Sequence, residues 1–114
     1  MTLGQKQRLF ATLAATLIQR AAELGYEVTF GETWRAPEWA AEMKKRGLSR
    51  IGAASLHCDR LAIDINLFRG ERYITTDEGH KELGAWWKAQ HSFARWGGDF
   101  EDPNHYSLEH NGRK

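Results

Sequence analysis

Two histidines and two aspartates carry the strongest chemical signal in this sequence. His57 and Asp64 lie seven positions apart, and Asp102 lies three residues before a second histidine, His105. Imidazole nitrogens and carboxylate oxygens are ligand types that borderline metals such as Zn²⁺ accept. Two histidines and one aspartate would leave a coordination position for water, which is typical of catalytic sites. The group therefore predicts a metal site that performs catalysis.

Asp102 is predicted to act beside the metal rather than on it. Zinc lowers the pKa of a bound water toward ~7. A neighbouring carboxylate can accept the proton of that water during attack and pass it to a leaving amine. The alternative is that Asp102, Pro103 and Asn104 form an ordinary turn, since all three residue types favour turns.

Arg35 and Ser55 are candidate substrate-binding residues. The guanidinium of Arg35 offers forked donors to a carboxylate or to a developing oxyanion. Alternatively, Arg35 is a surface residue stacked on Trp34. Ser55, two residues before His57, could hydrogen-bond the substrate or groups around the metal, or it could be an ordinary loop serine.

The remaining metal-binding residue types are weaker candidates. Cys58 follows His57 directly, so in an extended segment it would point to the opposite side, and we expect a small buried hydrophobe. His80 and His91 are expected on, or at the end of, an exposed helix. His110 is the one other histidine that could substitute for His105.

Composition excludes several classes of protein. The 16 Lys and Arg against 15 Asp and Glu give a net charge of +1, which predicts no binding to nucleic acid or acidic lipid. One cysteine excludes an internal disulfide and cysteine-rich zinc sites. No apolar run approaches the ~20 residues needed to cross a bilayer, and the charged N-terminal segment is unlike a signal peptide. We expect a monomer that is made in the cytoplasm and does not insert into membranes.

Hydrophobic periodicity predicts a single α+β domain over residues 1–114, with a small antiparallel sheet and about three helices. Alternation over 60–68 places Leu61, Ile63 and Ile65 on one strand face and Asp64 on the other, where it would face an open cleft. We expect Thr75 or Thr76 to cap the third helix. The expected elements are helices over 3–24, 37–46 and 77–90, strands over 26–30, 60–68, 73–74 and 105–110, and loops over 47–55 and 96–104.

The motifs of this chain resemble those of the zinc D-Ala-D-Ala peptidase family. They are Ser-x-His-x-x-x-x-x-x-Asp, Trp-Gly-Gly-Asp-Phe and Asp-x-x-His, and the resemblance runs from the Arg35 segment to His105. The family includes D,D-carboxypeptidases and phage L-alanyl-D-glutamate endopeptidases, and shares its fold with the hedgehog signalling domain. The resemblance implies the following roles: His57, Asp64 and His105 as zinc ligands, Asp102 as the catalytic base, Arg35 as the arginine that steadies the polarised carbonyl, and Ser55 as the leading serine.

Two positions depart from the family pattern. Arg60 stands where many members carry glycine, which predicts a more crowded approach to the strand. Many members have glutamate two residues after the last ligand, but here that residue is Ser107. The resemblance therefore leaves open which residue orients His105, with Asn66 and Ser107 as candidates.

The resemblance implies a zinc-dependent peptidoglycan peptidase of the phage endolysin type. We expect it to cut stem peptides, with the bond between L-Ala and D-Glu as first choice, and to reach the bacterial cell wall or periplasm from the host cytoplasm by holin-type release. The alternatives are a D-Ala-D-Ala carboxypeptidase and a catalytically silent hedgehog-like binding module. The free carboxylate of Asp102 argues against the binding module.

Overall fold

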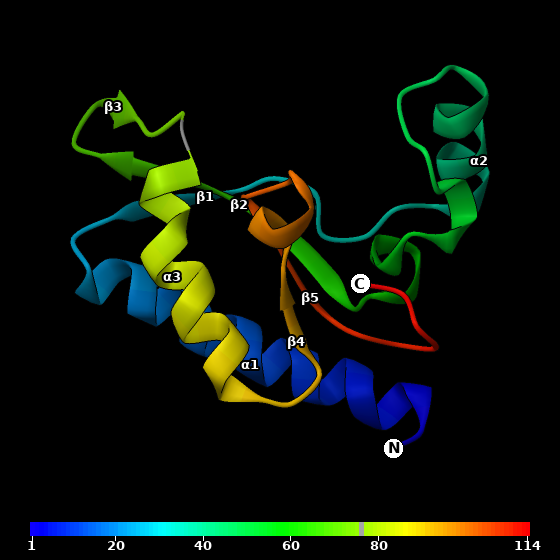
Figure 1. Ribbon diagram of the computed structural model, residues 1–114, viewed down its shortest axis with the longest axis horizontal. Coiled ribbons are helices and arrows are strands. Elements are labelled where there is room, and N and C mark those ends of the chain that lie inside the picture. Colours follow the sequence, from blue (N-terminus) through cyan, green and yellow to red (C-terminus); the bar gives the residue numbers. More distant parts are fainter. Residues whose placement is uncertain (76) are drawn as a thin grey trace.

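The computed structural model describes residues 1–75 and 77–114 (Figure 1). Within these residues the chain forms three α-helices, a five-stranded antiparallel sheet and three short 3₁₀ helices. The expected α+β class is therefore confirmed. In chain order the elements are α1 (Leu3–Glu23), β1 (Glu27–Phe30), α2 (Pro37–Lys45), η1 (Gly52–Ala54), η2 (Leu56–Asp59), β2 (Ala62–Arg69), β3 (Arg72–Tyr73), α3 (Asp77–Gln90), β4 (Ala94–Trp96), η3 (Gly97–Phe100) and β5 (His105–Leu108).

Helix α1 begins at a side-chain cap and ends before a glycine. The Thr2 hydroxyl accepts a hydrogen bond from the Gln5 backbone N–H, and the Gln5 side chain accepts one from the Thr2 N–H, which is a capping box. Gly25 follows the helix with φ of +89°, a conformation that glycine adopts at helix C-termini. The apolar stripe between these ends buries Phe10 and Leu17. None of the helices in the described part of the chain has the length and apolar character needed to cross a membrane.

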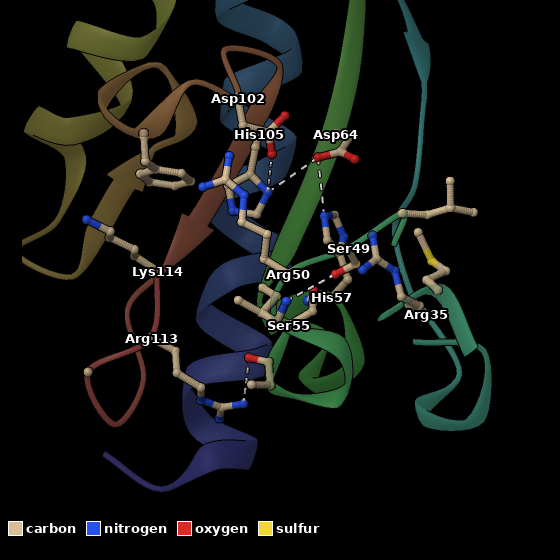
Figure 2. Close-up of a pocket in the computed structure, with 16 residues that line it drawn as sticks. Arg35, Ser49, Arg50, Ser55, His57, Asp64, Asp102, His105, Arg113 and Lys114 are labelled. Carbon is tan, nitrogen blue, oxygen red and sulfur yellow. Dashed lines mark hydrogen bonds and ion pairs between the residues drawn. The ribbon is translucent and has the colours of Figure 1, made fainter. Parts of the chain in front are cut away.

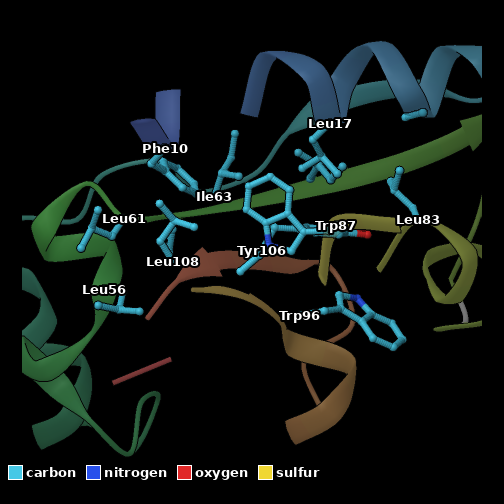
Figure 3. Close-up of a cluster of buried hydrophobic side chains, with 14 of the residues drawn as sticks. Phe10, Leu17, Leu56, Leu61, Ile63, Leu83, Trp87, Trp96, Tyr106 and Leu108 are labelled. Carbon is cyan, nitrogen blue, oxygen red and sulfur yellow. The ribbon is translucent and has the colours of Figure 1, made fainter. Parts of the chain in front are cut away.

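The sheet places one apolar face against helices α1 and α3. Its strand order is β1-β2-β5-β4, and β3 pairs with the end of β2. Ile63 and Ile65 of β2 are buried on the helix side, whereas Asp64 faces the opposite side, as the alternation predicts. The Trp87 ring packs edge-to-face on Phe10 and on Tyr106, with centroids 6.0 Å apart in both pairs (Figure 3).

The C-terminal third of the chain differs from expectation in two elements. Strand β4 was not predicted, because its three residues are too short for alternation to be recognised. It pairs with β5 through Ala94 opposite Leu108 and Trp96 opposite Tyr106. Strand β5 ends at Leu108 rather than at residue 110, and His110 forms an isolated bridge with Arg113. Of the two residues predicted to cap the third helix, Thr75 or Thr76, the second lies outside the described residues.

The expectation that His80 lies on an exposed helix face is wrong. His80 is only 4% exposed, and its Nδ1 lies 2.8 Å from the Tyr106 hydroxyl oxygen. Burial lowers the pKa of His80 to about 4, although the nearby charge of Asp77 opposes that shift. His80 is therefore a neutral core residue that connects α3 to β5.

Helix α2 stands apart from the other two helices in Figure 1 and packs against η1. Pro37 occupies its first turn, as predicted, since proline has no N–H to leave unpaired there. Ala40 is the buried residue of this helix, while Trp39 remains 44% exposed. Helix α2 and the segment that follows it thus form a wall beside the sheet rather than part of the core.

Candidate metal centre

The three predicted metal ligands converge at one point. Ligand atoms of His57, Asp64 and His105 all lie within 4.8 Å of one another (Figure 2). Asp64 Oδ1 is 3.2 Å from His57 Nε2 and 3.4 Å from His105 Nδ1. Two imidazole nitrogens and a carboxylate oxygen facing one point form a group that could hold a metal ion.

Strand pairing places two of these ligands side by side. Asp64 of β2 lies directly opposite His105 of β5 in the antiparallel register, so their side chains emerge on the same face. The backbone of Asp64 is also fixed on the β1 side, where its N–H donates to the Glu32 carbonyl at 2.8 Å and its carbonyl accepts from Gly31 at 2.8 Å. The sheet therefore sets the positions of Asp64 and His105.

His57 lies in the 3₁₀ helix η2 and not in the extended segment that was expected. The Ser55 hydroxyl caps this turn by accepting a hydrogen bond from the His57 backbone N–H at 3.2 Å. Ser55 lines the cavity but is only 2% exposed. Its hydroxyl is thus engaged in positioning His57, which agrees with the alternative in which Ser55 bonds a group around the metal site.

Arg60 ends η2 in the left-handed region, with φ of +57° and ψ of +36°. Glycine adopts this conformation without strain, which explains why glycine suits the position. The Arg60 guanidinium lies over the Trp34 ring, 4.8 Å from its centroid, and Arg60 is not among the residues that line the cavity. The expected crowding is therefore not seen, and Arg60 rather than Arg35 stacks on Trp34.

Arg35 lines the cavity and is held by a carboxylate that was not predicted. Its Nε donates to Glu32 Oε1 at 2.6 Å, and its terminal nitrogen pairs with the same oxygen. Glu32 Oε1 is also 3.9 Å from Nδ1 of His57, the ring nitrogen that faces away from Asp64. Carboxylates near the second nitrogen of a metal-binding histidine orient its ring. The sequence signal for Glu32 was a charged residue three positions before Arg35 and two positions after the end of a strand.

Asp102 lies beside the ligand group, with Oδ2 3.8 Å from His105 Nδ1. A tight loop brings them together: the Asp102 N–H donates to the Gly97 carbonyl at 2.8 Å, and the His105 N–H donates to the Asp102 carbonyl at 3.0 Å. A Cβ on Gly97 would lie 1.9 Å from the Asp102 carbonyl oxygen. Only glycine fits there, so Gly97 is required for this approach.

The two carboxyl groups of the centre have opposite pKa shifts. Burial alone would raise the pKa of Asp64, but the facing His105 and His57 rings outweigh burial and lower it to about 2. Burial raises the pKa of Asp102, and the nearby Asp64 carboxylate raises it further. Asp64 is the more strongly stabilised anion, as suits a metal ligand.

The centre lies in a cavity of about 540 Å³ between the sheet, the segment after α2 and the C-terminal residues. The Phe100 ring packs edge-on against His105, with centroids 5.6 Å apart. Sequence reasoning did not identify several residues of the lining, because isolated charged and apolar residues in loops carry no pattern. These residues are Met43, Leu48, Ser49, Arg50, Ile51, Phe100, Arg113 and Lys114.

Neither candidate for the residue that orients His105 makes a hydrogen bond to it. Asn66 donates to the Thr29 hydroxyl and accepts from the Tyr73 hydroxyl. Ser107 lies on the same face of β5 as His105, but its Oγ is buried without a partner among the described residues, as is His105 Nε2.

The other candidate side chains lie outside the ligand group. Cys58 is half-buried rather than buried, and burial raises the pKa of its thiol. His91 Nδ1 accepts from the Phe93 N–H at 3.1 Å. His110 Nδ1 lies 3.2 Å from Lys6 Nζ, so His110 does not take the place of His105.

Neither a scan against protein-family models nor a search of curated proteins gave a match for this chain. Its function must therefore be inferred from the chemistry of the site.

Proposed function

We propose that this protein is a zinc-dependent peptidase that hydrolyses an amide bond in the stem peptides of bacterial peptidoglycan. The bond between L-Ala and D-Glu is the preferred target. The observation that carries the proposal is the placement of Asp102 beside the group formed by His57, Asp64 and His105, at a cavity of about 540 Å³. A carboxylate next to a metal-binding group, but outside it, is what hydrolysis requires.

The donor set fits a zinc ion. His57 would bind through Nε2, His105 through Nδ1 and Asp64 through its carboxylate, a two-nitrogen, one-oxygen set that zinc accepts. Asp64 Oδ1 is buried and has no hydrogen-bond partner of good geometry in the described part of the chain, so a cation would satisfy it. When bound, zinc supplies a Lewis acid and lowers the pKa of a coordinated water to about 7.

The protein's own residues supply the remaining steps. Asp102 accepts the proton of the attacking water on its carboxylate and delivers it to the nitrogen of the leaving amine. Arg35, fixed by Glu32, donates hydrogen bonds to the carbonyl oxygen as negative charge develops there. Ser55 fixes the turn that carries His57. The expected setting is a phage-type lysin that acts on the wall after holin-type release.

A D-Ala-D-Ala carboxypeptidase is the second candidate. The observation in its favour is that Arg35, Arg50 and Arg113 line the same cavity, where an arginine could bind the terminal carboxylate of such a substrate. The two activities release different products from the same polymer.

Digestion of purified peptidoglycan by the zinc-loaded protein, followed by mass spectrometry of the released termini, tests the proposal. New N-terminal D-Glu is expected for the endopeptidase, whereas free D-Ala would identify the carboxypeptidase. Stoichiometric zinc binding without cleavage would contradict both activities and favour a binding module.

Variants separate metal binding from turnover. His57→Ala should lose zinc and activity together, because it removes one of three ligands. Asp102→Ala should keep zinc but lose roughly 10²–10⁴-fold in rate, the usual contribution of a general base. His91→Ala and Asp99→Ala are matched controls outside the ligand group and should behave as wild type. Full activity in Asp102→Ala would show that the assignment of the base is wrong.

A further inference from the structure

The lining of the cavity beside the candidate metal centre contains more cationic side chains than carboxylates. Its carboxylates are Asp64 and Asp102. A cationic side chain that has no partner in such a lining favours a ligand that carries negative charge. The cationic residues of the lining are Arg35, Arg50, Arg113 and Lys114.

Two of the four cations already have carboxylate partners in the protein. Arg35 pairs with Glu32 at 2.6 Å, and Arg113 pairs with Asp59 at 2.5 Å. The side chains of both arginines are mostly buried, which limits their freedom to reorient. Their charges are therefore largely balanced within the protein.

Arg50 is the arginine of the lining that makes no hydrogen bond or ion pair with any residue in the described ranges, 1–75 and 77–114. Its side chain is exposed and extends from the segment after α2 into the cavity, toward the side that holds His105 (Figure 2). The backbone next to it is anchored, because the Ser49 hydroxyl accepts hydrogen bonds from the N–H groups of Ile51 and Gly52. Arg50 thus presents five donors at an anchored position.

Lys114 is a second cationic side chain that favours an anionic group at this place. Its Nζ lies over the Phe100 ring, 5.2 Å from the centroid, and has no carboxylate partner in the described part of the chain. Leu48 and Ile51, which line the cavity on either side of Arg50 in sequence, are exposed and offer apolar contacts to the rest of a bound peptide.

We propose that Arg50 binds the free α-carboxylate of the D-Glu residue next to the scissile bond, and so selects stem peptides in which this group is not amidated. That carboxylate is attached to the carbon atom bearing the scissile nitrogen, so it must enter the cavity with the bond that is cut. A guanidinium fork matches a carboxylate with two parallel hydrogen bonds, but it cannot pair in this way with a carboxamide. The inference rests on the proposed function.

Steady-state kinetics on three synthetic peptides test the inference with zinc-loaded protein. They are L-Ala-γ-D-Glu-L-Lys, its D-isoglutamine counterpart, and a peptide ending in L-Lys-D-Ala-D-Ala. We expect wild type to prefer the first over the second by about 10- to 100-fold in kcat/KM, the range for a charged hydrogen bond. Arg50→Gln should remove this preference by slowing the first substrate alone, and Arg50→Lys should restore part of it.

Arg72→Gln is the matched control, because Arg72 is exposed on β3 and is not part of the cavity lining. It should keep the wild-type preference. Equal rates of wild type on the first two peptides would overturn the inference, and so would an equal loss on both in Arg50→Gln. Arg50-dependent cleavage confined to the D-Ala-D-Ala peptide would assign the bound carboxylate to the chain end, which overturns the D-Glu assignment.

Calorimetric binding to zinc-loaded Asp102→Asn protein separates failure of the inference from failure of the proposed function. Wild type could cleave no peptide and yet bind the D-Glu peptide about 10-fold more tightly than its amide, in a manner that depends on Arg50. That result would support recognition of the carboxylate by Arg50 and contradict the proposed hydrolysis. If wild type cleaves no peptide and the two peptides bind equally, both the inference and the proposed function fail.

Discussion

The two faces of the paired strands β2 and β5 differ in whether their buried polar atoms have hydrogen-bond partners. On the core face these atoms have partners: the Tyr106 hydroxyl lies 2.8 Å from His80 Nδ1, and Trp87 Nε1 donates to the carbonyls of Arg95 and Ser107. On the cavity face, Asp64 Oδ1, His105 Nε2 and Ser107 Oγ are buried without hydrogen-bond partners among the described residues.

The difference in hydrogen bonding between the two faces indicates where a ligand could bind. Buried polar groups in native proteins are almost always satisfied, so Asp64 Oδ1, which faces the two imidazoles, is an atom that a bound cation could satisfy. His57 Nδ1 is also buried without a hydrogen-bond partner, and Arg20 Nε is the one other buried side-chain atom without a partner in the described ranges. The core face is therefore satisfied by the protein alone, whereas the cavity face keeps a carboxylate oxygen that could bind a cation.

The largest effect is expected from breaking the core face. Trp87 is fully buried and contacts Phe10 and Tyr106, so Trp87→Ala should lower the free energy of unfolding by roughly 3–5 kcal/mol. Urea denaturation measures this loss. Trp87→Phe is the control and should lose less, because it keeps most of the apolar volume. A loss below about 1 kcal/mol in Trp87→Ala would contradict the assignment of this core.

The next effect concerns the titratable group of the core face. Because burial lowers the pKa of His80 to about 4, while the unfolded chain takes up the proton near 6.5, stability falls as the pH drops from 6.5 to 4. The contribution of His80 to this loss should be roughly 3 kcal/mol at pH 4. His80→Gln, which can still bond Tyr106, should show a correspondingly shallower decline in denaturation experiments. Identical slopes in the two proteins would refute a neutral, buried His80.

A smaller effect is expected on the cavity face, and only when metal is present. With free zinc at 100 times its dissociation constant, wild type should gain about 2.7 kcal/mol of stability. Asp64→Asn should lack this gain, yet its metal-free stability at pH 8 should stay within about 1 kcal/mol of wild type, since Asp64 lies outside the core. Thermal unfolding with zinc and with a chelator measures both quantities. Asp99→Asn is an exposed control and should respond to zinc as wild type does. If Asp64→Asn gained as much stability from zinc as wild type, Asp64 would not be a ligand.

The regular elements of the fold could be predicted because their side chains repeat with a recognisable period. Helix α1 and the alternation in β2 follow directly from apolar spacing, and that alternation correctly placed Asp64 on the face opposite Ile63. Strand β4 could not be found in this way, since three residues do not establish a period. His57 was misplaced in an extended segment because a 3₁₀ turn leaves no periodic signal.

The ligand group could be predicted from residue chemistry, but its surroundings could not. His57, Asp64 and His105 are strong ligand types whose joint presence is informative even without coordinates. Glu32 and Arg50 are ordinary surface residue types, and only the folded chain brings them to the cavity or to His57. The left-handed conformation of Arg60 was likewise not predicted, because the departure from glycine at this position was interpreted as crowding.

The place of the last residues on the cavity wall has a practical consequence for producing the protein. Gly112, Arg113 and Lys114 line the cavity, and the ion pair of Arg113 with Asp59 holds this segment there. Any sequence fused after Lys114 therefore starts at the cavity mouth. A polyhistidine purification tag at that end would offer extra imidazoles beside a centre built from imidazoles, and would distort both metal titrations and inhibitor screens. Met1 is exposed and is not part of the lining, so the opposite end is the better attachment point.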